Sequence, residues 1–231
     1  MSGIQKALNS ALQNKGQSVP TAITLVVDRS GSMGGYESQV VSSVQQFIKS
    51  QQDIKGSAIF TLAQFDDSYD VVFKDKEIKQ VDASQFHYSP RGGTRFRDAI
   101  VNSVKDMENY LKGATGKDQP KPKKVVIALI TDGQDTSSNN SVDKVRQLIE
   151  EKLKGGWNFL VLGADGSTLE FAKELGIPED TTAIYSVDKP DAGIKLLSEK
   201  VKQARKGKAI KIDQQERLAL REGRETEKKD L

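Results

Sequence analysis

Short apolar runs alternate along this chain with longer segments of helical periodicity, and this alternation limits its possible folds more than any other feature. The segments between the runs repeat their apolar residues every three or four positions, as helices do. The run VVIALI at 125–130 has no polar residue, which indicates a central strand buried on both faces. The predicted strands are 22–27, 58–65, 69–73, 125–130, 157–162 and 183–186, and the predicted helices are about 37–52, 96–111, 141–153, 167–175 and 190–204.

This pattern predicts an α/β fold, a doubly wound and mostly parallel six-stranded sheet with helices on both faces. Only Asp66, Asp67 and Ser68 separate the second run from the third. Such a short connection cannot contain a crossover helix, so these two strands are expected to form an antiparallel hairpin at one edge of the sheet.

We expect one domain at residues 18–205 and a different character at each end of the chain. Residues 1–17 form an N-terminal arm whose apolar stripe, Ile4, Leu8 and Leu12, either docks or frays. Residues 206–231 form a charged C-terminal tail with eight Lys or Arg and six Asp or Glu. With few apolar residues, this tail is predicted to be mobile or loosely helical.

Composition excludes several kinds of chemistry. The chain has no cysteine and one histidine, His87, which excludes thiolate zinc sites, iron–sulfur clusters, cysteine nucleophiles and two-histidine metal sites.

The formal net charge of +3 is close to balance, so no nucleic-acid partner is expected. No apolar run approaches the roughly 20 residues of a membrane span, so no membrane association is expected either. A signal-peptide pattern is missing, which predicts a cytoplasmic location, or a virion component if the protein is phage-encoded.

Three short polar clusters occur where predicted strands and helices meet. The cluster DRSGSM follows the first strand, GGT precedes the second helix, and TDG follows the central strand. The carboxyl ends of parallel strands meet at one edge of a sheet, so these clusters are expected to converge there. The side chains that they bring together carry only oxygen donors: Asp28, Ser30, Ser32, Thr94 and Asp132. Such a set suits Mg²⁺, with Mn²⁺ as an alternative.

With these residues in this order, the sequence resembles a von Willebrand factor type A domain carrying a metal-ion-dependent adhesion site. The motif of that family is Asp-x-Ser-x-Ser, then a distant Thr and a distant Asp. The resemblance implies a strand order of 3-2-1-4-5-6 with strand 3 antiparallel. It also implies that Ser30, Ser32 and, in one conformational state, Thr94 ligate the metal directly, while Asp28 and Asp132 ligate it or hold its waters. Asp135 is expected to lie outside the ligand set.

The resemblance is to the standalone forms of the family in bacteria and phages, through the segments GGTRFRDAI and FLVLGAD. It implies a non-enzymatic interaction module that binds an exposed Asp or Glu of a protein partner through the metal. Four arginines lie in the metal-site loops, and we expect them to favour such a partner: Arg29, Arg91, Arg95 and Arg97. Alternatively, they pair with acidic residues of this chain, namely Asp98, Asp132 or Asp135.

Two other functions remain open from the sequence. One is a structural component of a phage or other protein assembly in which the metal site is residual. The other is a metal-dependent hydrolase, which would need a general base near the metal. No histidine stands in the polar clusters to serve as that base, which disfavours the hydrolase.

Overall fold

A six-stranded sheet in the order β3-β2-β1-β4-β5-β6 forms the centre of the protein. The computed structural model describes residues 18–114, 121–186 and 188–224, so the predicted N-terminal arm lies outside the described residues. Neighbouring strands are parallel except β2 and β3, which form the predicted antiparallel hairpin. The strands are β1 (Thr21–Asp28), β2 (Ala58–Phe65), β3 (Tyr69–Glu77), β4 (Lys124–Ile130), β5 (Trp157–Gly163) and β6 (Thr182–Ile184).

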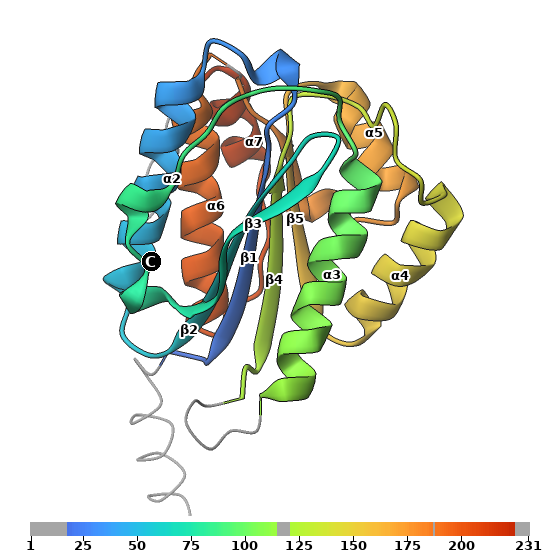
Figure 1. Ribbon diagram of the computed structural model, residues 1–231. Helices are drawn as coiled ribbons and strands as arrows, with labels where there is room; N and C mark the ends of the chain where they lie inside the picture. The colour runs from blue at the N-terminus through green and yellow to red at the C-terminus, as the bar shows by residue number, and fades with distance from the viewer. Residues whose placement is uncertain (1–17, 115–120, 187, 225–231) are drawn as a thin grey trace, which may run out of the picture.

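Helices cover both faces of the sheet, as the alternation predicts (Figure 1). One face carries α2 (Glu37–Gln52), α6 (Pro190–Arg205) and α7 (Gln214–Arg221). The other face carries α3 (Phe96–Gly113), α4 (Val142–Lys154) and α5 (Gly166–Glu174). The predicted fold class is therefore confirmed, including the strand order and the antiparallel strand.

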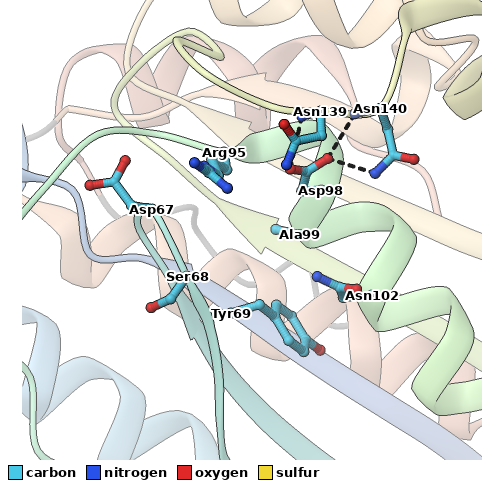
Figure 2. A pocket seen from close by; sticks show the side chains of 9 residues that line it. All are labelled: Asp67, Ser68, Tyr69, Arg95, Asp98, Ala99, Asn102, Asn139 and Asn140. Carbon is cyan, nitrogen blue, oxygen red and sulfur yellow. Dashed lines mark hydrogen bonds between the residues drawn. The ribbon is translucent and has the colours of Figure 1, made fainter.

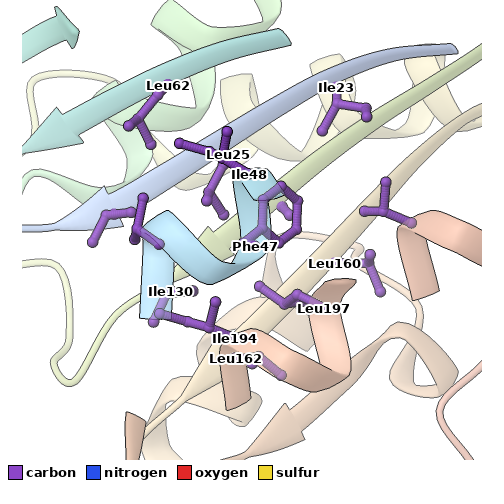
Figure 3. Packing of buried hydrophobic residues seen from close by; sticks show 14 of the residues in the cluster. Ile23, Leu25, Phe47, Ile48, Leu62, Ile130, Leu160, Leu162, Ile194 and Leu197 are labelled. Atoms are coloured by element: carbon purple, nitrogen blue, oxygen red, sulfur yellow. The ribbon is translucent and has the colours of Figure 1, made fainter. Parts of the chain in front are cut away.

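Strand β4 shows why the central run has no polar residue. Val126, Ala128 and Ile130 face the core beneath α2 and α6. The alternate residues, Ile127 and Leu129, face the core beneath α3, α4 and α5. Figure 3 shows the first of these cores, where α2 and α6 pack their apolar side chains onto the strands. Both faces of the strand are buried, so an apolar side chain is needed at every position.

The order of the strands creates a switch point between β1 and β4. From β1 the chain builds outward through β2 and β3, then returns to place β4 on the other side of β1. The segments that leave the carboxyl ends of these two central strands diverge, and such a divergence is where open α/β sheets bind ligands.

The C-terminal tail was predicted to be mobile or loosely helical; residues 206–224 contain the helix α7, and the mobile alternative is wrong for them. Ile210, Ile212 and Leu220 are buried in the core on the α2 side of the sheet. The backbone N–H of Ile212 donates to the carbonyl of Asp180 at 2.7 Å. These three apolar residues suffice to dock the segment, because each buried aliphatic side chain contributes about 1.5–3 kcal/mol. Residues 225–231 lie outside the described part of the chain.

A membrane-spanning helix was not expected from the sequence. Among the described residues, no helix combines the length and the apolar character that crossing a bilayer requires.

Candidate metal centre

The three polar clusters of the sequence meet at the carboxyl edge of the central strands. Asp28 is the last residue of β1, and Asp132 lies two residues beyond the end of β4, the neighbouring strand. The loop that carries Thr94 lies against the loop after β1, because Gly31 N donates to the carbonyl of Gly92 at 3.1 Å. The predicted convergence of these loops is therefore present in the fold.

Four of the five predicted ligand residues form one hydrogen-bonded group, which we call the hydroxyl-bonded cluster: Asp28, Ser30, Ser32 and Asp132. The hydroxyls of Ser30 and Ser32 lie 3.1 Å apart, and the hydroxyl of Ser32 donates to Asp132 Oδ1 at 2.9 Å. The backbone N–H of Ser30 donates to Asp28 Oδ1 at 2.7 Å. Two carboxylates and two hydroxyls thus share one small volume.

Thr94, the fifth residue, adjoins this cluster. Its hydroxyl lies beside Gly133, where an added Cβ would be 3.7 Å from Thr94 Oγ1. Its backbone is fixed by Thr136, whose N–H donates to the Thr94 carbonyl at 2.9 Å. In the described part of the chain no hydrogen bond links the Thr94 hydroxyl to the hydroxyl-bonded cluster. Whether these five residues ligate a metal stays a prediction.

Asp28 is a buried carboxylate without a cation beside it. Burial raises its pKa to about 6, although hydrogen bonds from the Thr131 hydroxyl and from Ser30 oppose the rise. Burial also raises the pKa of Asp132, and the negative charge of Asp165 adds to that rise. Within the described residues, no Lys or Arg forms an ion pair with Asp28 or Asp132. The sequence named Thr131 only as part of the TDG cluster, but its hydroxyl donates to Asp28 Oδ2.

The chemistry of these donors fits a hard divalent cation. All of the side-chain donors are oxygen atoms, which Mg²⁺ and Mn²⁺ prefer. The part of the chain that the structure describes holds no cluster of three or more His, Cys, Asp or Glu suited to a metal. A metal at this edge would therefore depend on the hydroxyls as well as on the two carboxylates, as the sequence motif predicts.

Three of the four arginines pair with acidic residues of this chain. Arg29 is buried and bonds to Asp66 and Asp70 on the β2–β3 hairpin. Arg91 bonds to the same two carboxylates, and we call these four residues the arginine-paired cluster. The sequence pattern did not indicate Asp66 or Asp70 as partners, although Asp66 follows directly after a predicted strand.

Arg97 pairs with Asp135, one of the partners considered in the sequence analysis. Its guanidinium lies 3.2 Å from Asp135 Oδ1, and its backbone N–H donates to Asp135 Oδ2 at 2.8 Å. Burial would raise the pKa of Asp135, but these bonds and those from Ser138 lower it. Asp135 thus binds the start of α3.

Arg95 differs from the other three arginines. In the described residues it forms no ion pair, and its Nε is buried without a hydrogen-bond partner. It lines a polar cleft of about 360 Å³ between the β2–β3 turn and the start of α3. Figure 2 shows its guanidinium between Asp67 on one side and Asp98 with Asn139 and Asn140 on the other. A role of the four arginines in partner binding stays a prediction.

Solved structures with this fold include a mussel protein and a bacterial pilus protein. Proximal thread matrix protein 1 from the mussel byssus is 19% identical, with a TM-score of 0.62, and the match covers 82% of this chain and 47% of that one. A second structure of it has a zinc-occupied MIDAS motif (17% identical, TM-score 0.56, covering 79% and 48%). This chain therefore spans about half the length of the mussel protein.

The pilus protein is Mfa5 from Porphyromonas gingivalis, a type V pili tip protein whose vWF domain is 13% identical. That match covers 81% of this chain and 97% of that domain, with a TM-score of 0.59. At such low identities the likeness concerns the fold. No curated protein sequence matches the chain. The model of the von Willebrand factor type A domain matches residues 22–200, which is well over half of the chain. The chain therefore belongs to the von Willebrand factor type A domain family.

Proposed function

We propose that this protein is an interaction module that binds an acidic residue of a protein partner through Mg²⁺ or Mn²⁺. The observation that carries the proposal is the pair of carboxylates, Asp28 and Asp132, which meet two hydroxyls and, among the residues that the structure describes, form no ion pair with a basic side chain. Taking a carboxylate out of water is costly unless a cation or several donors compensate it. A divalent cation would supply that compensation here.

The residues that would hold the metal are the five that the motif names: Asp28, Ser30, Ser32, Thr94 and Asp132. Three of them carry neutral hydroxyls, so a bound divalent cation keeps part of its charge and can accept a carboxylate from outside the chain. This is the expected role of the Asp or Glu of the partner. Neither nucleic acid nor a membrane is part of the proposal.

The arginines divide into two groups in this proposal. Arg29 and Arg97 are held by acidic residues of the chain, so they support the loops. Arg91 also pairs with Asp66 and Asp70 but keeps a side chain that is 64% exposed, whereas Arg95 lines the polar cleft and forms no ion pair with a described residue. These two are the arginines that we assign to the partner interface, where they would steer an acidic surface toward the metal.

Members of this family are generally non-enzymatic adhesion or structural modules, and the proposal follows them. The pilus tip protein Mfa5 and the pilus adhesin SpaC from Lactobacillus rhamnosus share the fold, which supports a role in binding other proteins. A byssal matrix protein also shares it, which supports the alternative of a structural component. The cytoplasmic location, or a place in a virion, stays a prediction of the sequence.

Metal binding is tested first by titrating the protein with Mn²⁺ and measuring free Mn²⁺ by electron paramagnetic resonance. We expect one site, which Ser32→Ala weakens strongly and Mg²⁺ competes for. Ser42→Ala is the matched control, since Ser42 is an exposed serine of α2 that bonds only within its own helix. Equal affinity of the two variants would contradict the assigned ligands.

The open coordination position is tested with two short capped peptides, one containing a single Glu and the other Gln in its place. The relaxation rate of water protons by the Mn²⁺-loaded protein reports water bound to the metal. We expect the Glu peptide to lower this rate by displacing water and the Gln peptide to leave it unchanged. Identical behaviour of the two peptides would contradict carboxylate binding at the metal.

A further inference from the structure

We infer that Asp66, which follows β2, is a positioning residue whose carboxylate holds together the two loops that carry the proposed metal ligands. The inference rests on the proposed function, because it concerns how the same metal centre is kept in shape. It adds a residue of the β2–β3 hairpin, which lies outside the sequence motif.

One oxygen atom of Asp66 joins the two loops. Asp66 Oδ2 accepts a hydrogen bond from Arg29 Nε at 2.9 Å and another from Arg91 Nε at 2.9 Å. Arg29 stands between Asp28 and Ser30 in the loop after β1, and Arg91 precedes Thr94 by three residues. The two side chains that reach the carboxylate therefore come from the loops that supply four of the five proposed ligands.

Asp66 is itself held firmly. Its other oxygen, Oδ1, accepts hydrogen bonds from the N–H of Ser68 at 2.7 Å and from the Ser68 hydroxyl at 2.8 Å. Its backbone carbonyl accepts from Arg95 N at 3.0 Å. The residue is 2% exposed, so water cannot replace these partners easily. A rigid carboxylate of this kind fixes whatever bonds to it.

The two loops also contact one another directly. Arg91 N donates to the carbonyl of Arg29 at 2.8 Å, and Gly31 N donates to the carbonyl of Gly92 at 3.1 Å. Gly92 has a left-handed φ of +66°, a conformation that favours glycine, and the N–H of Gly93 donates to Asp67 Oδ2 of the hairpin at 3.0 Å. The loop before Thr94 is thus pressed against both the hairpin and the loop after β1.

Charge explains why these contacts depend on Asp66. Arg29 and Arg91 are two cations that converge on one oxygen atom, so without the carboxylate they would repel each other. Asp70 bonds to the same two arginines, but its side chain is 50% exposed and water competes for its place. Asp70 therefore makes a matched control, since it has the same chemical partners and differs in burial.

The first test needs no metal. Hydrogen exchange is measured by mass spectrometry on the wild type, Asp66→Asn and Asp70→Asn in the presence of EDTA. We expect Asp66→Asn to speed exchange in the segments 28–33 and 90–95, whose amides bond between the loops, and Asp70→Asn to change them far less. A change confined to residues 66–70, or equal changes in both variants, would overturn the positioning role.

The second test measures the affinity for Mn²⁺ by isothermal titration calorimetry at a temperature where circular dichroism shows each variant folded. We expect Asp66→Asn to weaken binding about 10- to 100-fold, the usual effect of losing a residue that orients metal ligands. For Asp70→Asn we expect a change below about threefold. Unchanged affinity of Asp66→Asn would overturn the inference while leaving the metal site in place.

Arg91→Ala serves if Asp66→Asn does not fold. It leaves the Asp66–Arg29 pair intact and removes only the side-chain link to the loop of Thr94, so we expect faster exchange in 90–95 and weaker Mn²⁺ binding. The inference would be overturned if Arg91→Ala changed neither the exchange rate in 90–95 nor the affinity for Mn²⁺. A wild-type protein that binds no Mn²⁺ would contradict the proposed function. The hydrogen-exchange test of the positioning role is made in EDTA, so its result does not depend on metal binding.

Discussion

Two carboxylate clusters lie at the same edge of the sheet, and the protein compensates them in opposite ways. In the arginine-paired cluster, burial would raise the pKa of Asp66, but Ser68, Arg91 and Arg29 together lower it to about 2. In the hydroxyl-bonded cluster, burial raises the pKa of Asp28 to about 6. Both residues have little exposed surface, at 2% and 0%, but only Asp66 has guanidinium partners that lower the pKa of its carboxyl.

The difference indicates where a cation from outside is needed. The chain supplies two guanidinium groups to Asp66, whereas Asp28 receives only hydrogen bonds from Ser30 and Thr131 and faces the like charge of Asp132. A buried carboxylate without a counter-ion favours either a proton or a metal ion. The first cluster is therefore compensated by arginines of the protein itself, and the second is the one that the proposed metal would compensate.

Removing the carboxylate from the complete cluster is expected to have the largest effect on stability. Asp66→Ala leaves the buried Arg29 with only the half-exposed Asp70, and breaking a buried ion pair costs about 3–5 kcal/mol. Urea unfolding in EDTA measures this change in the free energy of unfolding. Asp70→Ala is the control, at about 1 kcal/mol or less. Similar losses in both variants would contradict the importance of burial in this cluster.

Acid should weaken the arginine-paired cluster. The pKa of Asp66 is about 2 in the folded protein against an ordinary 3.8, so its charge stabilises the fold above about pH 4. That contribution, on the order of 2 kcal/mol, disappears as the pH falls toward 2. Urea unfolding at pH 5 and pH 2.5 should show a smaller loss for Asp66→Asn than for the wild type. Equal losses would mean that Asp66 is not held by its arginines.

Neutralising Asp28 in the hydroxyl-bonded cluster is expected to change the free energy of unfolding in the opposite direction. Asp28→Asn removes a buried charge that forms no ion pair with a described Lys or Arg, so in EDTA the variant should be as stable as the wild type or up to about 2 kcal/mol more stable. In the variant the Thr131 hydroxyl can donate instead to the Gly133 carbonyl, which lies 3.1 Å from it. Urea unfolding at pH 8 checks this. A loss above about 2 kcal/mol would contradict the contrast between the clusters.

The smallest expected effect on stability is that of Arg91→Ala. Its side chain is 64% exposed, and exposed ion pairs contribute at most about 1 kcal/mol. The melting temperature should fall only slightly, although the proposed metal affinity should fall more. A large loss of stability would show that Arg91 matters to the fold as much as the buried Arg29 does.

The sequence predicted the hydroxyl-bonded cluster better than the arginine-paired one, for a physical reason. Asp28 and Asp132 follow neighbouring parallel strands, so the strand pattern and the sheet topology bring them together. Whether Arg29 reaches Asp66 depends on the direction in which the Arg29 side chain extends toward the end of β2. The spacing of apolar residues along the sequence does not specify that direction. The alternative that the arginines pair with acidic residues of this chain was correct for Arg97 and Asp135. That Arg29 and Arg91 pair with Asp66 and Asp70 of the hairpin was not predicted.

The docking of the C-terminal segment was missed for a related reason. Its charges indicated a mobile or loosely helical tail, yet Ile210, Ile212 and Leu220 are buried among the residues of one core. Sparse apolar residues are enough where the fold already offers a surface to cover, and a sequence pattern does not show that surface. The regular elements of the sheet and its helices were predicted because each carries its own periodicity.

The stabilisation of the protein by Mg²⁺ tests the account most directly. A ligand that binds only the folded state adds RT ln(1 + [L]/Kd), about 2.7 kcal/mol at a hundredfold excess over Kd. Urea unfolding of the wild type and of Asp28→Asn is measured in EDTA and in saturating Mg²⁺. We predict a gain of this size for the wild type and none for Asp28→Asn. Equal stability of the wild type in both solutions, or the same gain in the variant, would contradict a metal centre at Asp28.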